Sequence, residues 1–382
     1  MQRIVLFSGG SACRSINIAL CHKAQLTRVV PAWDSGGSSR IIREKTGLLA
    51  VGDLRQALMT MAHGEGRAGD VVKVCNARLS SNLGKEDALS EFLFYSEGRH
   101  PLLERMEPGL RGAILNYLKT FASTVGTDFD FRNGSIGNFI LAGACLAHNG
   151  DINTAVFVFR KLCSIVGDVW TSSLDSDLVL SATLKDGKRI ERQDAITNLV
   201  DEDANVGIAH VKLSTGTEAE PQANPAMLEA LTKADLIAFG PGSFYTSLLP
   251  HLQIHGIAEA LSQVDCPRVW IGNILQCRET IDRTLGELLD VVSEQWQGEQ
   301  ATRHPLVTHV LANRVFYPFE KTIGSFPYLS HAMTERDYTV ITGEYEDAWS
   351  RGQHDGEAVA SALLDLAEER SGMKGPAGTP LN

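Results

Sequence analysis

Short apolar runs alternate with amphipathic stretches along most of the chain. The opening residues show the pattern: an apolar run at 4–7, a small-residue loop at 8–12, a helix-like stretch to about Lys23, and a second apolar run at 29–33. This order of strand, loop, helix and strand predicts an α/β fold with a Rossmann-like, doubly wound, mostly parallel sheet and helices on both faces. Further runs with the pattern of strands occupy residues 236–239, 268–271, 308–311 and 338–342.

Apolar positions at helical spacing predict a series of amphipathic helices. Asp53 precedes one such stretch and is expected to be its N-cap. Asp186-Gly187 separates two alternating runs, which predicts an antiparallel hairpin in the sheet or in an appended lobe. Other predicted helices lie near residues 87–95, 110–121, 151–165, 281–292 and 357–369.

The pattern predicts one domain over residues 1–370, with a helical insertion near 64–130. The insertion carries mixed polar residues and no recognisable chemistry, which is typical of a cap over a sheet edge. Residues 371–382 are rich in Gly and Pro and are expected to be a disordered tail.

Charge and composition narrow the classes of partner. A formal net charge of -11 argues against a broad nucleic-acid surface, which needs clustered Lys and Arg. No apolar run reaches the roughly 18 residues of a transmembrane helix. Seven cysteines without a CxxC pair indicate a reducing cytoplasmic setting. The expected partner is a small-molecule nucleotide, with no nucleic acid and no membrane, and a homo-oligomer is left open.

The first small-residue loop contains Gly9, Gly10 and Ser11 between a strand and a helix. Glycines there allow backbone amides to approach a phosphate, and the serine adds a hydroxyl. The loop lacks the third glycine of a dinucleotide fingerprint and the Gly-Lys-Ser/Thr of a Walker A loop. A tight turn without a ligand is therefore an equal alternative.

The second loop combines an acid, small residues and a base within seven positions. Asp34 follows the strand, where a carboxylate commonly meets a ribose hydroxyl, Mg²⁺ or a reacting hydroxyl. Arg40 closes the loop and can neutralise a phosphate. The small residues between them are Gly36, Gly37, Ser38 and Ser39. We expect this loop to bind a ligand, although a solvated Asx turn is the simpler alternative.

Two later loops also feed helix starts, where free N–H groups can meet an anion. The first leads into a helix that is apolar on all sides, and its candidate phosphate contacts are Gly134, Ser135 and Asn138. The second follows the run at 236–239, and its candidates are Gly240, Pro241, Gly242, Ser243, Thr246 and Ser247. Hydroxyl-capped helix starts without a ligand are the alternative for both.

Taken in order, these loops resemble the CofD-like superfamily over about residues 3–295. The matching motifs are SGGS, DSGGSSR, GDLR, NGSIGNFILAG and GPGSFYTSLLPHL followed by GIAEAL. The superfamily includes the 2-phospho-L-lactate transferases of deazaflavin cofactor synthesis and the YvcK-like gluconeogenesis factors. The DSGGSSR and GPGSFYTSLLP motifs are more similar to the second branch.

The resemblance implies a nucleotide diphosphate or nucleotide-sugar ligand. In the transferase branch it implies Mg²⁺-dependent movement of a phospho-lactyl-type group to an acceptor hydroxyl. Asp34 would then lie near metal or acceptor, with Arg40 neutralising charge, and residues 240–243 would lie near the nucleotide. The family's second loop usually opens with paired acids, whereas here Trp33 precedes a lone Asp34. A non-catalytic nucleotide-binding regulator is therefore the alternative.

Overall fold

The computed structural model describes residues 1–62, 68–217, 219–299, 305–314, 322–333 and 337–373. Its centre is a seven-stranded sheet in the order β12-β9-β8-β7-β1-β2-β3, in which every neighbouring pair is parallel. Its strands are β1 (Arg3–Phe7), β2 (Gln25–Val30), β3 (Asp168–Thr171), β7 (Leu236–Phe239), β8 (Arg268–Ile271), β9 (His309–Asn313) and β12 (Thr339–Gly343). The predicted doubly wound α/β sheet with helices on both faces is confirmed.

The central strands form because they are short, apolar and buried on both faces, as parallel sheets require. The last four residues of β1, Ile4–Phe7, are buried, and so is all of β7. Helices α1 (Arg14–Cys21), α3 (Gly52–Met61) and α15 (Gly356–Met373) form one packed group, in which α1 contacts both of the others. Helices α12 (Pro225–Thr232) and α13 (Ile257–Gln263) pack on each other. Further elements around the sheet are α2 (Gly37–Thr46), η2 (Phe244–Leu248), η3 (Leu249–Gln253) and α14 (Leu285–Glu299).

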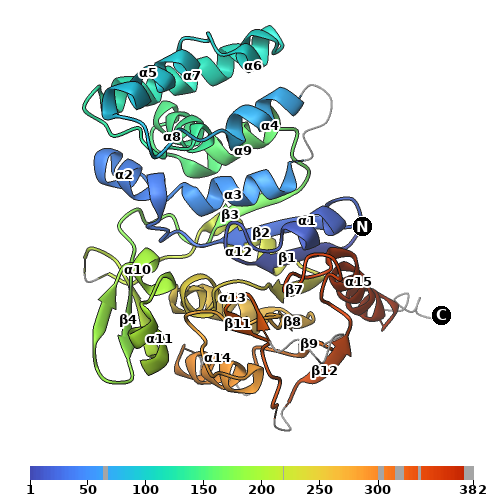
Figure 1. Ribbon diagram of the computed structural model, residues 1–382. Helices are drawn as coiled ribbons and strands as arrows, with labels where there is room; N and C mark the ends of the chain where they lie inside the picture. Colours follow the sequence, from blue (N-terminus) through green and yellow to red (C-terminus); the bar gives the residue numbers. More distant parts are fainter. Residues whose placement is uncertain (63–67, 218, 300–304, 315–321, 334–336, 374–382) are drawn as a thin grey trace, which may run out of the picture.

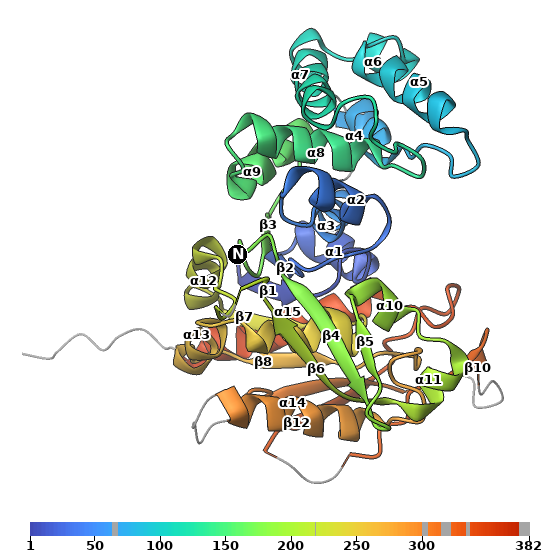
Figure 2. The same cartoon turned by 90° about the vertical axis from the view of Figure 1, so that its left-hand side faces the viewer.

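A helical layer lies beyond α3, on the β3 side of the sheet, in both views (Figures 1 and 2). It is built on the buried helix α8 (Ile136–Ala147), which packs against its neighbours on several sides. Asp151 caps α9 (Ile152–Leu162) through its side chain, as expected. The layer contains α4 (Gly69–Asn76), α5 (Lys85–Ser96), α6 (Pro101–Glu104), α7 (Pro108–Val125), α8 (Ile136–Ala147) and α9 (Ile152–Leu162).

The predicted hairpin belongs to a second, three-stranded antiparallel sheet with the order β5-β4-β6, separate from the central one. Its strands are β4 (Val179–Leu184), β5 (Arg189–Glu191) and β6 (Ile208–Ser214), and α10 (Gln193–Thr197) and α11 (Asp201–Val206) follow the hairpin. A short antiparallel pair, β10 (Thr322–Ile323) and β11 (Phe326–Pro327), was not expected. Helix α15 continues to Met373, beyond the predicted tail start, and residues 374–382 lie outside the described ones.

Within the described residues, no helix combines the length and apolar character that a membrane crossing requires.

Candidate functional site

The strand order reverses between β1 and β7, which are hydrogen-bonded neighbours although they are far apart in sequence. Ligands of open α/β sheets bind at such a switch point, outside the carboxyl ends of the strands. Two of the predicted loops meet there, and we call residues 8–12 and 240–243 the switch-point loops. Gly240 donates its N–H to the Phe7 carbonyl at 2.7 Å, and the Gly242 backbone lies beside Gly9.

The first switch-point loop is organised from beneath by Arg28, a fully buried arginine in β2. Its guanidinium donates to the Ser8 hydroxyl at 2.5 Å and to the Gly9 carbonyl at 2.6 Å, and it lies within 3.5 Å of the Gly10 and Ala12 carbonyls. Burial lowers the pKa of Arg28. Because the cation draws these carbonyls inward, it fixes the loop conformation that a phosphate would meet.

Glycine is required at position 10 by a close approach. A Cβ on Gly10 would lie 2.6 Å from both the Cα and Oδ1 of Asp53 at the start of α3. Gly9 faces the other half of the crevice, since a Cβ there would lie 3.1 Å from the Ser247 hydroxyl. The structure therefore places Gly9 beside Ser247 and Gly10 beside Asp53.

Asp34 and Asp53 form an acid pair. Asp34 is buried, and its Oδ1 accepts the Gly36 N–H at 2.9 Å. The backbone of Asp53 also donates to the Asp34 carboxylate. Burial raises the pKa of Asp34, and burial together with the charge of Asp34 raises the pKa of Asp53 to about 7. Two such carboxylates side by side in a crevice are typical of catalytic or metal sites.

This geometry corrects two expectations. Asp53 is not the N-cap of α3, because that position is Val51, and no side chain caps the helix. Asp34 is also not a lone acid, since α3 supplies the second carboxylate that the loop itself lacks. Sequence reasoning missed the pair because its members are 19 positions apart.

The acid pair fits Mg²⁺ in one specific way. Among the described residues, no group of three His, Cys, Asp or Glu side chains is arranged to hold a metal ion. Mg²⁺ commonly binds through one or two carboxylates together with substrate phosphates and water. Asp34 and Asp53 therefore suit an ion that arrives with a phosphate ligand, and they do not suit a permanent protein-only site.

Helix N-termini converge around the acid pair. The Ser38 hydroxyl near the start of α2 accepts the Asn138 amide of α8 at 3.0 Å, and Ser39 accepts the Gly52 N–H of α3 at 3.2 Å. Arg55 donates from Nε to the Asn138 Oδ1 at 3.0 Å. The positive ends of these helices and Arg55 provide the setting in which an anion is stabilised.

Arg55 was not singled out from the sequence, because it sits inside a helical stretch. Burial, followed by the charge of Arg78, lowers the pKa of Arg55 to about 10, and Asp34 and Asp53 partly oppose that shift. Arg78 donates to the Asn133 carbonyl at 2.6 Å, beside the predicted loop at Gly134. The two arginines therefore lie on the same side of the site as α8.

Arg40 faces its own helix and a separate cavity, and not the acid pair. It lies 3.8 Å from Glu44 on the same helix and lines a cavity of about 380 Å³ between α2 and the β4 sheet. The arginine that reaches the second loop is Arg43, which donates to the Asp34 carbonyl at 3.3 Å and to the Leu178 carbonyl at 2.8 Å. A catalytic role for Arg40 stays a prediction that this placement does not favour.

The second switch-point loop is only partly available to a ligand. Glu279 is buried beneath η2 and accepts the N–H groups of Tyr245 and Thr246 at 2.9 and 3.2 Å. The Thr246 hydroxyl donates to the same carboxylate at 2.6 Å. Thr246 thus faces the interior. Asn273, two residues after β8, binds both the N–H and the carbonyl of Gly242, at 3.1 and 2.9 Å.

The placement of the predicted site residues follows from these contacts. One group lies around the crevice and the acid pair: Gly9, Gly10, Ser11, Asp34, Gly36, Gly37, Ser38, Ser39, Gly134, Ser135, Asn138, Gly240, Pro241, Gly242, Ser243 and Ser247. The residues that sequence reasoning missed are Arg28, Arg43, Asp53 as a ligand-facing acid, Arg55, Arg78 and Glu279. Arg28 carried one usable signal, since it is a charged residue directly before the apolar run at 29–33.

Comparison with known proteins identifies the family to which the chain is similar. The family model described as "2-phospho-L-lactate transferase CofD" matches residues 4–324. A gluconeogenesis factor of Listeria monocytogenes is 24% identical over 377 residues, covering 97% of this chain and 98% of that protein. A Nostoc protein, provisionally named a gluconeogenesis factor, is 29% identical over 274 residues. That alignment covers 72% of this chain but only 47% of the Nostoc protein.

A solved structure supports the fold. The crystal structure of a UPF0052 family member from Bacillus halodurans superimposes with a TM-score of 0.70 at 22% identity, covering 95% of this chain and 100% of that one.

Proposed function

The chain belongs to the CofD family, and from this premise we propose that it binds a nucleoside diphosphate group with Mg²⁺ and transfers a phosphorus-containing group to an acceptor hydroxyl. The observation that carries the proposal is the Asp34–Asp53 pair beside the switch-point loops. A carboxylate pair next to free amides and helix N-termini matches the needs of phosphoryl transfer, which are positioning and charge stabilisation.

Each part of the site has a defined role in this proposal. The amides of the switch-point loops would bind the diphosphate, and Arg55 with the α8 start would balance its charge. Asp34 would hold Mg²⁺ together with phosphate oxygens, and the ion would supply charge neutralisation on those oxygens. Arg28 keeps the first loop in place from beneath.

The transfer step balances without a covalent enzyme intermediate. The acceptor oxygen forms a bond to the terminal phosphorus, and the bond from that phosphorus to the nucleoside monophosphate breaks. The proton of the acceptor hydroxyl passes to Asp53, the carboxylate beside Asp34, which acts as the general base. The nucleoside monophosphate leaves with the bonding electron pair.

Calorimetric titration tests the binding half of the proposal. Guanosine, uridine and adenosine diphosphates are titrated into the wild type and into Asp34→Asn, each with Mg²⁺ and with EDTA. We expect Mg²⁺ to tighten binding about tenfold or more in the wild type and to have no effect in Asp34→Asn. Asp186→Asn, in the exposed β4–β5 turn, is the matched control and should behave as the wild type. Absence of nucleotide binding by the wild type contradicts the proposal.

A second candidate function is a nucleotide or nucleotide-sugar-binding regulator. It is favoured by the Listeria relative, which is named a gluconeogenesis factor and aligns over nearly its whole length. Phosphorus-31 NMR of the bound diphosphate, recorded with hydroxyl acceptors added, separates the two functions. Conversion of the diphosphate signals to monophosphate supports the transferase. Tight binding that is independent of Mg²⁺, with unchanged signals, supports the regulator.

A further inference from the structure

A turn at residues 346–354 follows the strand β12 at the carboxyl edge of the sheet. A β-bridge between Glu346 and His354 closes it. The His354 ring lies 3.0 Å from the Gly272 carbonyl just after β8, and the Ser15 hydroxyl of α1 donates to the His354 carbonyl at 2.8 Å. The turn is thus fastened to β8 and to the helix that follows the first switch-point loop.

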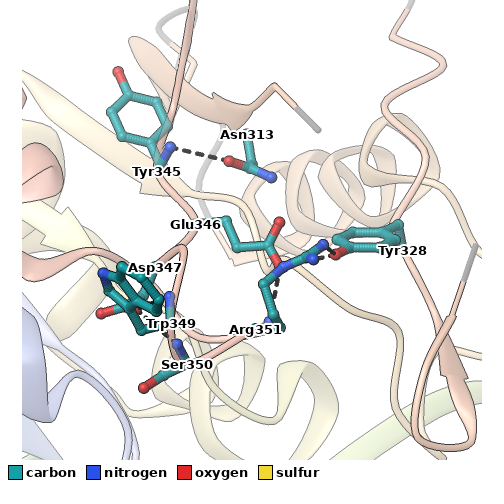
Figure 3. Close-up of polar contacts among 9 residues, drawn as sticks. Asn313, Tyr328, Tyr345, Glu346, Asp347, Trp349, Ser350 and Arg351 are labelled. Atoms are coloured by element: carbon teal, nitrogen blue, oxygen red, sulfur yellow. Dashed lines mark hydrogen bonds and ion pairs between the residues drawn. The ribbon is translucent and has the colours of Figure 1, made fainter. Parts of the chain in front are cut away.

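Buried polar contacts hold one side of this turn (Figure 3). The Glu346 side chain is fully buried, and its Oε1 accepts from the Tyr328 hydroxyl at 2.8 Å. The same oxygen accepts from Arg351 Nε at 3.0 Å and from the Gly352 N–H at 2.8 Å. Such a network fixes the backbone of the turn, because each contact to the buried carboxylate is charge-assisted.

The other side of the turn presents an indole. Asp347 Oδ1 accepts the N–H groups of both Trp349 and Ser350 at 2.7 Å, which shapes an Asx turn around the tryptophan. Trp349 is 96% exposed, whereas Trp33, Trp270 and Trp296 are each at most 4% exposed. In Figure 3 the indole lies away from the Glu346–Arg351–Tyr328 cluster, on the side where the ribbon has the blue of the N-terminal segment.

A large apolar ring held in solvent by an ordered turn gains nothing for folding, because burying an indole is one of the larger stabilising changes available. We therefore expect the exposed face of the Trp349 ring to contact a ligand. The contacts of the turn indicate which ligand. Gly272 is followed directly by Asn273, which holds Gly242 of the second switch-point loop at both backbone groups. The turn is therefore linked to both halves of the crevice.

We propose that Trp349 is the stacking platform for the base of the nucleotide whose diphosphate binds at the switch-point loops. This inference rests on the proposed function and adds to it the residue that recognises the nucleoside. Stacking on an indole is tolerant of base identity, since every base has a π-face. Trp349 therefore supplies affinity for a nucleoside over a bare diphosphate.

The test compares a nucleotide with its own phosphate part. Guanosine diphosphate and inorganic pyrophosphate are titrated, with Mg²⁺, into the wild type, Trp349→Ala and Trp349→Phe. In Trp349→Ala we expect guanosine diphosphate affinity to fall about 5- to 100-fold and pyrophosphate affinity to stay unchanged. Trp349→Phe should fall between the two. Phe157→Ala, which removes a 53% exposed aromatic ring from α9, is the control and should match the wild type.

Fluorescence gives an independent readout in the unmodified protein. Iodide should quench an exposed component of the tryptophan emission that is absent in Trp349→Ala, and guanosine diphosphate should protect that component.

The outcomes are distinguishable from failure of the proposed function itself. If the wild type binds neither pyrophosphate nor the nucleotide, the proposed function fails and the inference with it. If both bind and Trp349→Ala leaves the ratio of their affinities unchanged, only the stacking inference is overturned. An equal loss for both ligands overturns it as well, because it assigns the residue a structural role. A change in sedimentation without a change in nucleotide affinity would instead identify a contact between copies.

Discussion

The Asp34 carboxylate is in direct contact with the start of the helix that carries Asp53. It accepts a hydrogen bond from the Asp53 backbone, and its Oδ2 lies only 2.1 Å from where a Cβ on Gly52 would be. Each acid is thus positioned by the backbone beside the other.

Replacing Asp53 with Asn should stabilise the ligand-free protein at neutral and alkaline pH. Burial raises the pKa of Asp53 from 3.8 to about 7, so ionisation costs the folded state more than the unfolded state. The penalty is absent below about pH 4, grows as pH rises towards 7, and is complete above that. Thermal unfolding in EDTA should show Asp53→Asn melting higher than the wild type at pH 8, by about 2–4 °C for each kcal/mol.

At pH 4 the two melting temperatures should nearly converge, because Asp53 is then protonated in the folded state and about half protonated in the unfolded state, so little of the penalty is present. Asp186→Asn is the control at both values, since Asp186 is an exposed turn residue. An unchanged difference between pH 4 and pH 8 would show that Asp53 does not carry the raised pKa.

Gly52→Ala should destabilise the protein even though alanine is the better helix former. The new methyl group would force the Asp34 carboxylate to move, at a cost of about 1–3 kcal/mol. Urea denaturation measures the change, and calorimetry should show a weaker Mg²⁺ effect on nucleotide binding. Gly112→Ala in α7 is the matched control. A Cβ there meets no atom within 4 Å, so we expect stabilisation by about 0.5–1 kcal/mol. Equal changes in stability for Gly52→Ala and Gly112→Ala would show that Gly52 does not contact the Asp34 carboxylate.

Arg28→Met should lower the free energy of unfolding by about 3 kcal/mol or more, because the inward carbonyls of Gly9 and Gly10 lose a buried donor. Amide hydrogen exchange should accelerate over residues 8–13 more than in the preceding strand β1. Arg189→Met, on the exposed strand β5, removes a cation without buried contacts and should leave both quantities unchanged. Normal exchange in the first loop of Arg28→Met would mean that the loop holds its shape unaided.

Arg55 and Arg40 should differ in their effect on diphosphate binding. Arg55→Ala removes a cation that interacts with both members of the acid pair and is expected to weaken pyrophosphate binding about tenfold. Arg40→Ala should leave it within about twofold, because Arg40 faces Glu44 and the cavity beside β4. Calorimetry with pyrophosphate and Mg²⁺ measures both. A larger loss of pyrophosphate affinity in Arg40→Ala than in Arg55→Ala would instead support Arg40 as the residue that neutralises the phosphate charge.

Much of the fold could be predicted because it depends on local pattern. The buried run at 236–239 coincides with β7, and Asp151 caps α9 as its side-chain chemistry suggested. Hairpin prediction at Asp186-Gly187 was likewise confirmed, because the turn residues specify the pairing. The strand order could not be read in this way, since β1 pairs with β7 across more than half of the chain.

The candidate site likewise has features that the local sequence predicts and features that depend on the tertiary structure. The small-residue loops were recognisable because glycine permits close backbone approach, and the approach of Gly10 to Asp53 shows why one is needed there. Asp53 itself was read as a helix cap because that is its local chemistry. Its partnership with Asp34, and its pKa of about 7, depend on burial and on a charge brought near by folding.

The sequence by itself determined the α/β class, the glycine loops and the family resemblance, because each depends on residues that are close together along the chain. Only the tertiary structure decided which acids meet, that Arg28 lies beneath the first loop, and that Glu279 satisfies the amides of Tyr245 and Thr246. It also decided that Trp349 stays exposed at the carboxyl edge of the sheet. The physical reason is that pKa shifts and buried hydrogen bonds arise from distances in space, which residue spacing along the chain does not encode.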